Sequence, residues 1–170
     1  EAAAAIRREL SAFRVHFDGR DEYKPGWKFS EWELRGVPLR IEIGPRDVAS
    51  RQVTLVRRDN RERRAVPMEG AAQAVGELLQ GLQRDLLGRA RDFLASNTVN
   101  VTDMEEMQEA IAARKFVWAD WCGQMSCELA VKEKTGGTIR NIPLERDLRP
   151  GRCVYCGQPS DGPVIFARAY

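Results

Sequence analysis

The segment PGWKFSEWELRGVPLRIEIGPRD, residues 25–47, decides the fold of the first half of the chain. Pro25 stands where a proline opens a helix, and Gly36 stands where a glycine ends one. Apolar and charged side chains then alternate over residues 37–43, which is typical of a strand with one buried face. The segment therefore predicts a helix followed by a half-buried strand.

The flanking residues extend this pattern on both sides. We expect a helix over 1–12, a strand over 13–17, a turn at 18–21, a hairpin formed by 52–58 and 62–67 that turns at Asp59-Asn60, and a long amphipathic helix over 70–94. This order of helices and strands indicates an α/β fold. No strand precedes the first helix, although such a layer normally has one, so we expect the chain to begin partway into its domain.

The composition changes around Ser96-Asn97-Thr98, and we expect a domain boundary there, with domains at 1–95 and 96–170. Beyond the boundary the pattern predicts a small α+β domain. Its expected elements are a helix that starts at the capping-box pattern Thr102-x-x-Glu105, an aromatic strand over Phe116–Trp121, a short helix beginning near Cys127, a turn at Gly136-Gly137 and a final strand over Val164–Ala167.

Composition excludes some classes of protein. The 170 residues are 43% hydrophobic, which is enough for a core, and the net charge is only +2. No apolar run is long enough for a membrane, and the opening EAAAAIRREL is not a signal peptide, so we expect a soluble, cytoplasmic protein. Between Arg51 and Arg64 six arginines stand against two acids, which indicates either a solvated face or an edge that faces nucleic-acid phosphates.

Side chains for hydrolytic catalysis are scarce. The only histidine, His16, alternates with apolar neighbours in FRVHF, so we interpret it as a strand residue rather than a catalyst. Serine and cysteine nucleophiles need an imidazole with partners. The sequence also lacks a glycine-rich loop of the P-loop or Rossmann kind.

The four cysteines form two pairs in the last third of the chain. Cys122 and Cys127 are spaced C-x4-C, and Cys153 and Cys156 are spaced C-x2-C. Two short thiolate loops of this kind can close around a tetrahedral zinc ion, and four thiolates leave no open position, so the metal would be structural. The alternatives are a redox-active pair, or four reduced cysteines that only pack.

A second group of residues, in the segment that decides the fold, has the chemistry to recognise bases. Phe29 and Glu33 share one helix face, Arg40 lies on the polar face of the strand, and Arg46 and Asp47 follow that strand. An unpaired guanine offers two acceptors to an arginine fork, two donors to a carboxylate, and a ring for stacking. The alternative is a set of surface ion pairs, with Trp27 and Trp32 in the core.

The same run, residues 25–47, is strongly similar to the signature of the anticodon-binding domain of prolyl-tRNA synthetases. The downstream layout, including the end Val164-Ile-Phe-Ala-Arg-Ala-Tyr170, resembles the archaeal-like subgroup that carries a zinc-binding C-terminal domain and ends in tyrosine. The resemblance covers essentially the whole chain. It implies a class II anticodon-binding domain, with a mixed sheet flanked by helices and its first strand missing, followed by a small zinc-binding α+β domain.

The resemblance also implies roles for individual residues. The readers of the two anticodon guanines would be Glu33, Arg40, Arg46 and Asp47, with Phe29 and Arg58 as weaker candidates. The family often has lysine where Arg46 stands, which keeps the charge but changes the donor geometry. The four cysteines match the zinc ligands of the family, and Tyr170 would reach toward the active site.

Members of this family are homodimers that use ATP and Mg²⁺ to join proline to tRNA(Pro). The class II catalytic motifs are absent from this sequence, so the residues that handle ATP and Mg²⁺ would lie upstream and this piece alone would be inactive. We expect the tRNA(Pro) anticodon loop as its partner, and neither DNA nor membrane. Two alternatives are a free-standing tRNA-binding or regulatory protein without ligase activity, and a zinc-stabilised interaction domain without an RNA role.

Overall fold

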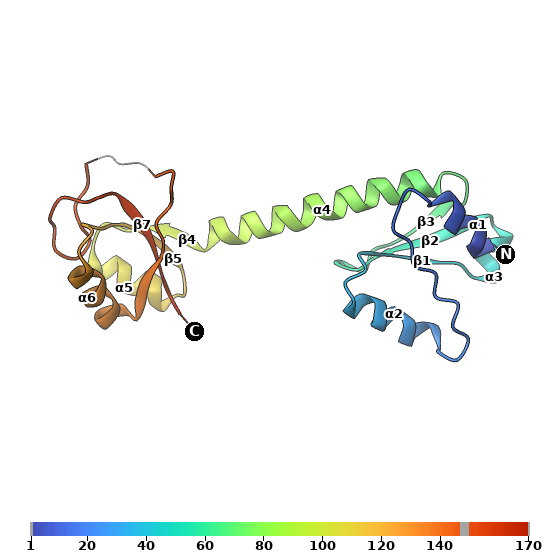
Figure 1. Cartoon of the computed structure of the whole chain (residues 1–170), viewed down its shortest axis with the longest axis horizontal. Coiled ribbons are helices and arrows are strands. Elements are labelled where there is room, and N and C mark those ends of the chain that lie inside the picture. Colours follow the sequence, from blue (N-terminus) through green and yellow to red (C-terminus); the bar gives the residue numbers. More distant parts are fainter. Residues whose placement is uncertain (1, 147–149, 170) are drawn as a thin grey trace. The chain divides into compact units, whose positions relative to one another are not determined.

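The computed structural model describes residues 2–146 and 150–169 (Figure 1). The chain forms two compact units, Glu1–Gly88 and Arg89–Tyr170, and the long helix α4 (Ala71–Ser96) passes through the division. Within the described residues, no helix is both long enough and apolar enough to cross a bilayer. The boundary expected at 95/96 falls at the end of α4 and stays a prediction.

The first unit is built on a three-stranded antiparallel sheet in the order β1-β2-β3. Besides the start of α4, its elements are α1 (Ala2–Glu9), α2 (Pro25–Leu34), β1 (Leu39–Glu42), α3 (Pro45–Ala49), β2 (Gln52–Arg57) and β3 (Arg63–Pro67). The structure confirms the predicted helix that starts at Pro25, the strand within residues 37–43, the hairpin of residues 52–67 and the long helix predicted over 70–94. The short helix α3 was not predicted, because it follows the strand without any apolar periodicity of its own.

The two faces of this sheet differ in what covers them. Side chains of α1 and α4 pack on one face, around Leu10, Val53 and Val75. None of the residues of α2 is fully buried, and α2 instead contacts the polar side chains of β1 through Glu33. The alternation of residues 37–43 therefore separates an apolar core face from a charged face that carries α2.

The strand predicted over residues 13–17 is wrong, because these residues form an irregular segment after α1. The side chains of Phe13 and Val15 pack against the core, which explains the alternation, but no described strand pairs with the segment. The ring of His16 lies 4.0 Å from that of Trp32, measured between centroids. The first helix ends at Glu9 rather than at residue 12.

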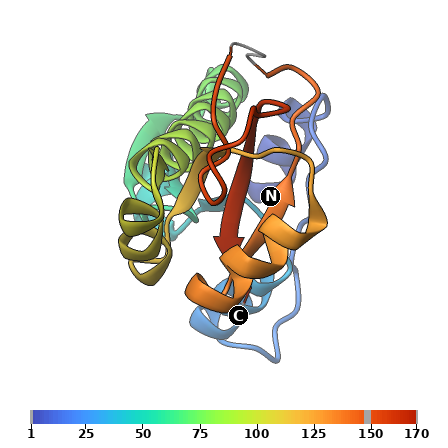
Figure 2. The same cartoon turned by 90° about the vertical axis from the view of Figure 1, so that its left-hand side faces the viewer.

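The second unit contains a four-stranded sheet in the order β4-β5-β7-β6 (Figure 2). Its elements after α4 are β4 (Thr98–Asn100), α5 (Met104–Ala112), β5 (Phe116–Asp120), α6 (Met125–Thr135), β6 (Gly137–Asn141) and β7 (Pro163–Arg168). β4 and β5 are parallel and the other pairs are antiparallel, so this sheet is mixed. The mixed sheet was expected in the anticodon-binding domain, whose described strands β1, β2 and β3 pair antiparallel. Helices α5 and α6 bury Met107, Ile111 and Val131 against Val117 and Phe166.

The start of α5 differs by one residue from the predicted capping box. Asp103 is the N-cap, and its side chain accepts hydrogen bonds from the backbone N–H groups of Glu105 and Glu106, each at 2.9 Å. Glu106 in turn accepts from the backbone N–H of Thr102 at 3.0 Å. An aspartate is as good a cap as a threonine, which is why the sequence pattern allowed both frames. Strands β4 and β6 were also not predicted.

Candidate functional site

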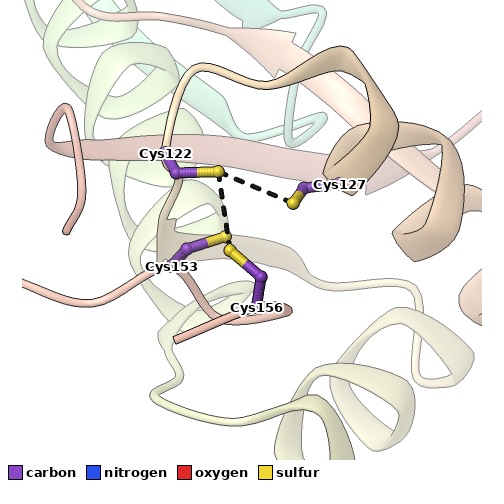
Figure 3. A group of neighbouring side chains, drawn as sticks. All are labelled: Cys122, Cys127, Cys153 and Cys156. Carbon is purple, nitrogen blue, oxygen red and sulfur yellow. Dashed lines mark hydrogen bonds between the residues drawn. The ribbon is translucent and has the colours of Figure 1, made fainter. Parts of the chain in front are cut away.

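The four cysteine side chains converge on one point in the second unit (Figure 3). Cys122 follows β5, Cys127 lies in the first turn of α6, and Cys153 and Cys156 lie in the loop before β7. All four sulfur atoms lie within 4.8 Å of one another. The Sγ atom of Cys122 is 3.5 Å from that of Cys127 and 3.7 Å from that of Cys156.

This donor set fits a tetrahedral metal ion. Zinc–thiolate bonds of about 2.3 Å place the sulfurs of a tetrahedron about 3.8 Å apart, close to the two distances found here. All four cysteines are free, and their separations far exceed the roughly 2.0 Å of a disulfide bond. Four clustered thiols without a histidine or carboxylate among them can thus hold a metal ion in a closed site.

Two glycines shape the loops that carry the cysteines. Gly123 and Gly157 directly follow a cysteine in each pair, and their φ angles of 76° and 70° lie in the left-handed region. A side chain on Gly123 would also collide with the carboxylate of Asp161. The second loop is tied to the end of β5 because the N–H of Asp161 donates to the carbonyl of Trp121 at 2.8 Å. Hydrogen bonds of the fold therefore bring the two cysteine pairs together.

Burial sets the electrostatics of the cluster. It raises the pKa of Cys122 and raises the pKa of Cys127 to about 12, because the interior disfavours a thiolate. Burial acts in the same direction on Cys153, but the backbone N–H groups of Cys156 and Tyr155 donate to its sulfur and bring its pKa down to about 7. A divalent cation would supply the positive charge that the other thiolates need.

A second cluster lies on the charged face of the first sheet. It consists of Phe29 and Glu33 from α2, Arg40 and Glu42 from β1, and Arg63 from β3, and we call it the Arg40 cluster. Arg40 donates from Nη1 to Glu33 at 2.7 Å and from Nε to Glu42 at 2.9 Å. Its guanidinium also lies 4.0 Å from the centroid of the Phe29 ring. Arg63 forms a two-point ion pair with Glu42.

The side chains of the Arg40 cluster differ in how far they are exposed to solvent. The side chains of Arg40 and Glu42 are 21% and 18% exposed, whereas that of Glu33 is 36% exposed. Burial acts to raise the pKa of Glu42, but the hydrogen bonds from Arg63 and Arg40 outweigh it and lower the pKa. Among the described residues, nothing hydrogen-bonds to Nη2 of Arg40 or to Oε2 of Glu33. One donor group and one acceptor atom remain for a ligand.

The other predicted base readers are placed differently. Asp47 accepts from the N–H of Gly44 at 2.8 Å and so caps α3. The pKa of Arg63 is raised mainly by the hydrogen bonds that Arg63 donates to Glu42, and the charge of Asp47 adds to this effect. Asp47 therefore lies beside the cluster rather than in it. Arg46 is exposed at the start of α3.

Arg58, the remaining predicted base reader, lies outside the Arg40 cluster. The half-buried Arg58 has its guanidinium next to Gly36. Tyr170 lies outside the described residues.

Sequence reasoning missed Glu42 and Arg63 as members of the cluster. Glu42 stands two positions after Arg40 on the same strand face, and this spacing was a usable signal. Arg63 belongs to the basic segment between residues 51 and 64, but its partner depends on the register of the sheet. The arginines of that segment do not form a single exposed face, because Arg57 is only 7% exposed and pairs with Asp59 and Asp85.

The interpretation of Trp27 and Trp32 as core residues is wrong for Trp27. Trp27 is 48% exposed and stacks on Tyr23 with ring centroids 4.0 Å apart. Trp32 is half-buried, and its Nε1 donates to Asp18 at 2.8 Å. Both rings therefore connect the loop before α2 to that helix. The surface ion pairs of the alternative interpretation are present as well as the Arg40 cluster.

Comparison with known proteins gives matches over both units. Residues 1–78 match the family model "Anticodon binding domain", and residues 104–170 match "Prolyl-tRNA synthetase, C-terminal". The chain is 42% identical to "Proline--tRNA ligase 2" of Clostridioides difficile (strain 630), over 92% of this chain and 33% of that protein. It is 44% identical to "Proline--tRNA ligase" of Ruminiclostridium cellulolyticum, over 100% of this chain and 36% of that protein.

A third relative extends the agreement. "Proline--tRNA ligase" of Chloroflexus aurantiacus (strain J-10-fl) is 46% identical, over 98% of this chain and 36% of that protein. The chain thus spans about a third of the length of the curated relatives that it matches. From the two family models and these identities, we conclude that the chain belongs to the prolyl-tRNA synthetase family and corresponds to its C-terminal part.

Proposed function

We propose that the chain is the tRNA-reading part of a proline–tRNA ligase, with an anticodon-binding domain at 1–95 and a structural zinc domain at 96–170. The whole enzyme would join proline to tRNA(Pro) with ATP and Mg²⁺, as a cytoplasmic homodimer. Catalysis would reside in the part of the relatives that this chain does not span. The contribution of this chain would be recognition and architecture.

The observation that carries this proposal is the arrangement of Phe29, Glu33 and Arg40. In the part of the chain that the structure describes, no hydrogen bond reaches Nη2 of Arg40 or Oε2 of Glu33, and the guanidinium of Arg40 lies over the Phe29 ring. In an RNA loop, a guanine can donate from N1 and N2 to a carboxylate, accept at O6 or N7 from an arginine, and lie against a planar group. The open donor and acceptor match that pattern. Arg46, Asp47 and Arg58 would add contacts around it.

The Arg40 cluster also limits the cost of binding. Arg40 is already fixed by Glu33, Glu42 and Phe29, so little side-chain freedom is lost when a base arrives. The ion pair between Glu42 and Arg63 holds Glu42 in place. A preorganised donor of this kind favours selective hydrogen bonding over loose charge attraction.

The metal we propose for the second unit is zinc. Cys122, Cys127, Cys153 and Cys156 supply four soft donors, which zinc accepts in a closed tetrahedral site. Such a site has no position for water or substrate, so its role is to stabilise a small domain. The four cysteines would hold two loops and the first turn of α6 together.

Anticodon recognition is tested with the whole chain and a fluorescein-labelled stem-loop that carries the proline anticodon. Fluorescence anisotropy should give tighter binding than for a stem-loop in which both guanines are replaced by adenine. We expect a loss of about 1–3 kcal/mol for each guanine. Equal affinity for the two stem-loops would refute guanine reading and favour a zinc-stabilised interaction domain.

A further inference from the structure

The second unit contains a basic cavity away from the four cysteines. It has a volume of about 700 Å³ and is lined by Arg114, Lys115, Arg140 and Arg168, together with Phe116 and two alanines. None of these described lining residues is acidic. Phe116 is 36% exposed, so an aromatic ring is accessible in the wall of the cavity.

The fold brings these cations together from three separate segments. Arg114 occupies the tight turn between α5 and β5, with a φ of 58°. β5 runs antiparallel to β7, so the start of β5 lies beside the end of β7, where Arg168 stands. On the other side of β7 the pairing of β6 is irregular between Ile139 and Asn141, and Arg140 is the unpaired residue. Arg140 thus lies beside the middle of β7 rather than at its end, and its side chain lines the same cavity as Arg114, Lys115 and Arg168.

The charges in this cavity are not neutralised internally. Lys115 donates to the carbonyl of Ser96 at 2.9 Å and to Oδ1 of Asn97 at 3.0 Å, which are neutral acceptors. Within the described residues, Arg114, Arg140 and Arg168 have no ion-pair partner. In the first unit, by contrast, Arg40, Arg57 and Arg63 are each paired with a carboxylate. Like charges gathered around a cavity favour the binding of an anion.

We propose that this basic cavity binds backbone phosphates of the tRNA, an extension that rests on the proposed tRNA-binding function. Arginine forks bind phosphate oxygens at two points, and the Phe116 ring offers a surface for a ribose or a base. A nucleotide site commonly uses backbone N–H groups of a glycine-rich loop, and the sequence has none. Long side chains from three segments suit an extended phosphate backbone better than one compact triphosphate.

The test measures the affinity of the whole chain for a fluorescein-labelled proline tRNA transcript over a series of salt concentrations. The Arg140→Gln/Arg168→Gln variant should bind more weakly, and the slope of log affinity against log salt should fall by about 0.7–0.9 for each phosphate that is no longer bound. An Arg140→Lys/Arg168→Lys variant should keep most of the slope, since lysine also binds phosphate. An unchanged slope in the glutamine variant would overturn the proposal.

Matched controls separate the cavity from charge in general. An Arg91→Gln/Lys132→Gln variant removes two exposed cations of the same unit outside the cavity and should keep the wild-type slope. An equal fall in this control would also overturn the proposal. Amide hydrogen exchange in β5 and β7 shows whether the double cavity variant folds. If it does not, Arg140→Gln alone is used, because Arg140 is exposed and has no pairing partner at the irregular strand position. This single variant should show about half the slope change.

A second transcript keeps this proposal distinguishable from guanine reading. In a tRNA whose anticodon guanines are replaced by adenine, the cavity variant should show the same fall in slope. Equal binding of both transcripts to the wild-type chain would reject guanine reading and leave the cavity effect to be judged by the variants. Displacement of the tRNA by ATP from the wild-type chain but not from the glutamine variant would identify a nucleotide site instead and reject the RNA backbone.

Discussion

Arg40 donates to Glu33 at 2.7 Å, so the proposed donor and the proposed acceptor of the base-reading site hold each other before any base arrives. Among residues 2–146 and 150–169, each keeps one polar group without a hydrogen bond, and the guanidinium lies over the Phe29 ring. The pair therefore works as one unit. Substitution of either member would therefore change the position of the other as well as remove its own proposed hydrogen bond to the base.

We predict that Arg40→Lys weakens binding of the proline anticodon stem-loop by about 1–3 kcal/mol. Lysine keeps the charge but lacks the planar fork that bonds Glu33 and Glu42 and stacks on Phe29. The measurement is fluorescence anisotropy, and Arg35→Lys is the matched control because Arg35, which directly follows α2, pairs with Glu31 instead. Equal losses of affinity in the two variants would indicate a general charge effect and contradict base reading by Arg40.

Glu33→Gln should show coupling to that substitution. Glutamine can still accept from Arg40, but it lacks the charge that favours the N1–H and N2–H₂ groups of guanine. In a double-mutant cycle the losses of binding free energy for Glu33→Gln and Arg40→Lys should be non-additive, because the two side chains are in contact. Strict additivity of the two binding losses would contradict a shared site.

The stability of the first unit should depend on pH through Glu42. Arg63 and Arg40 lower the pKa of this carboxyl below its usual 4.5 despite its burial. A lowered folded-state pKa means that the stabilisation is complete above about pH 4.5 and is lost as the pH falls through the folded value. The difference in unfolding free energy between the wild type and Glu42→Gln should therefore narrow on acidification below pH 4.5. A difference that stays constant down to the lowest accessible pH would contradict this.

The first unit shows what the sequence could and could not predict. Alternation in residues 37–43 was enough to place Arg40 and Glu42 on one face, because side-chain direction in a strand has a period of two. The partner of Glu42 was not predictable, since Arg63 reaches it across β2 and a one-residue slip of either hairpin strand would turn its side chain to the other face. The strand expected at 13–17 failed for a related reason: alternation reports contact with a core, not a pairing partner.

In the second unit, local chemistry was more informative than pairing. The spacing of Cys122, Cys127, Cys153 and Cys156 was sufficient to predict their convergence, because each pair closes a short loop on its own. Strand β4 was missed because it has only three residues and pairs in parallel with β5, an arrangement that depends on how the intervening helix folds back. The basic cavity combines side chains from three separate segments and has no sequence pattern of its own.

A buried ion pair should govern the stability of the first unit. Arg57 and Asp59 have side chains that are only 8% and 6% exposed, and Arg57 also bonds to Asp85 of α4 at 2.7 Å. We predict that Arg57→Met lowers the unfolding free energy by about 3 kcal/mol, because the buried carboxylate of Asp59 loses its cation. Amide hydrogen exchange in β2 and β3 measures this destabilisation.

The control for this ion pair is Arg51→Met. Arg51 and Glu69 form a pair whose side chains are 81% and 84% exposed, so solvent screens their attraction. Its removal should change stability by less than about 1 kcal/mol. Similar destabilisation by the two substitutions would contradict the structural role of burial at Arg57.

Metal removal should affect the two units differently. We predict that the protein purified without chelator contains about one zinc ion per chain, and that chelation unfolds residues from β5 to β7 while α1 to β3 keep their protection. The reason is that the four cysteines tie the loop before β7 to the end of β5 and to α6, whereas the core of the first unit shares no residue with them.

Elemental analysis gives the metal content, and amide hydrogen exchange before and after chelation gives the protection of each strand. Cys127→Ser should reproduce the effect of the chelator, and Ser160→Ala, which alters the same loop without touching a sulfur, should keep the metal. Full protection of β5 and β7 in a zinc-free chain would show that packing alone holds the second unit.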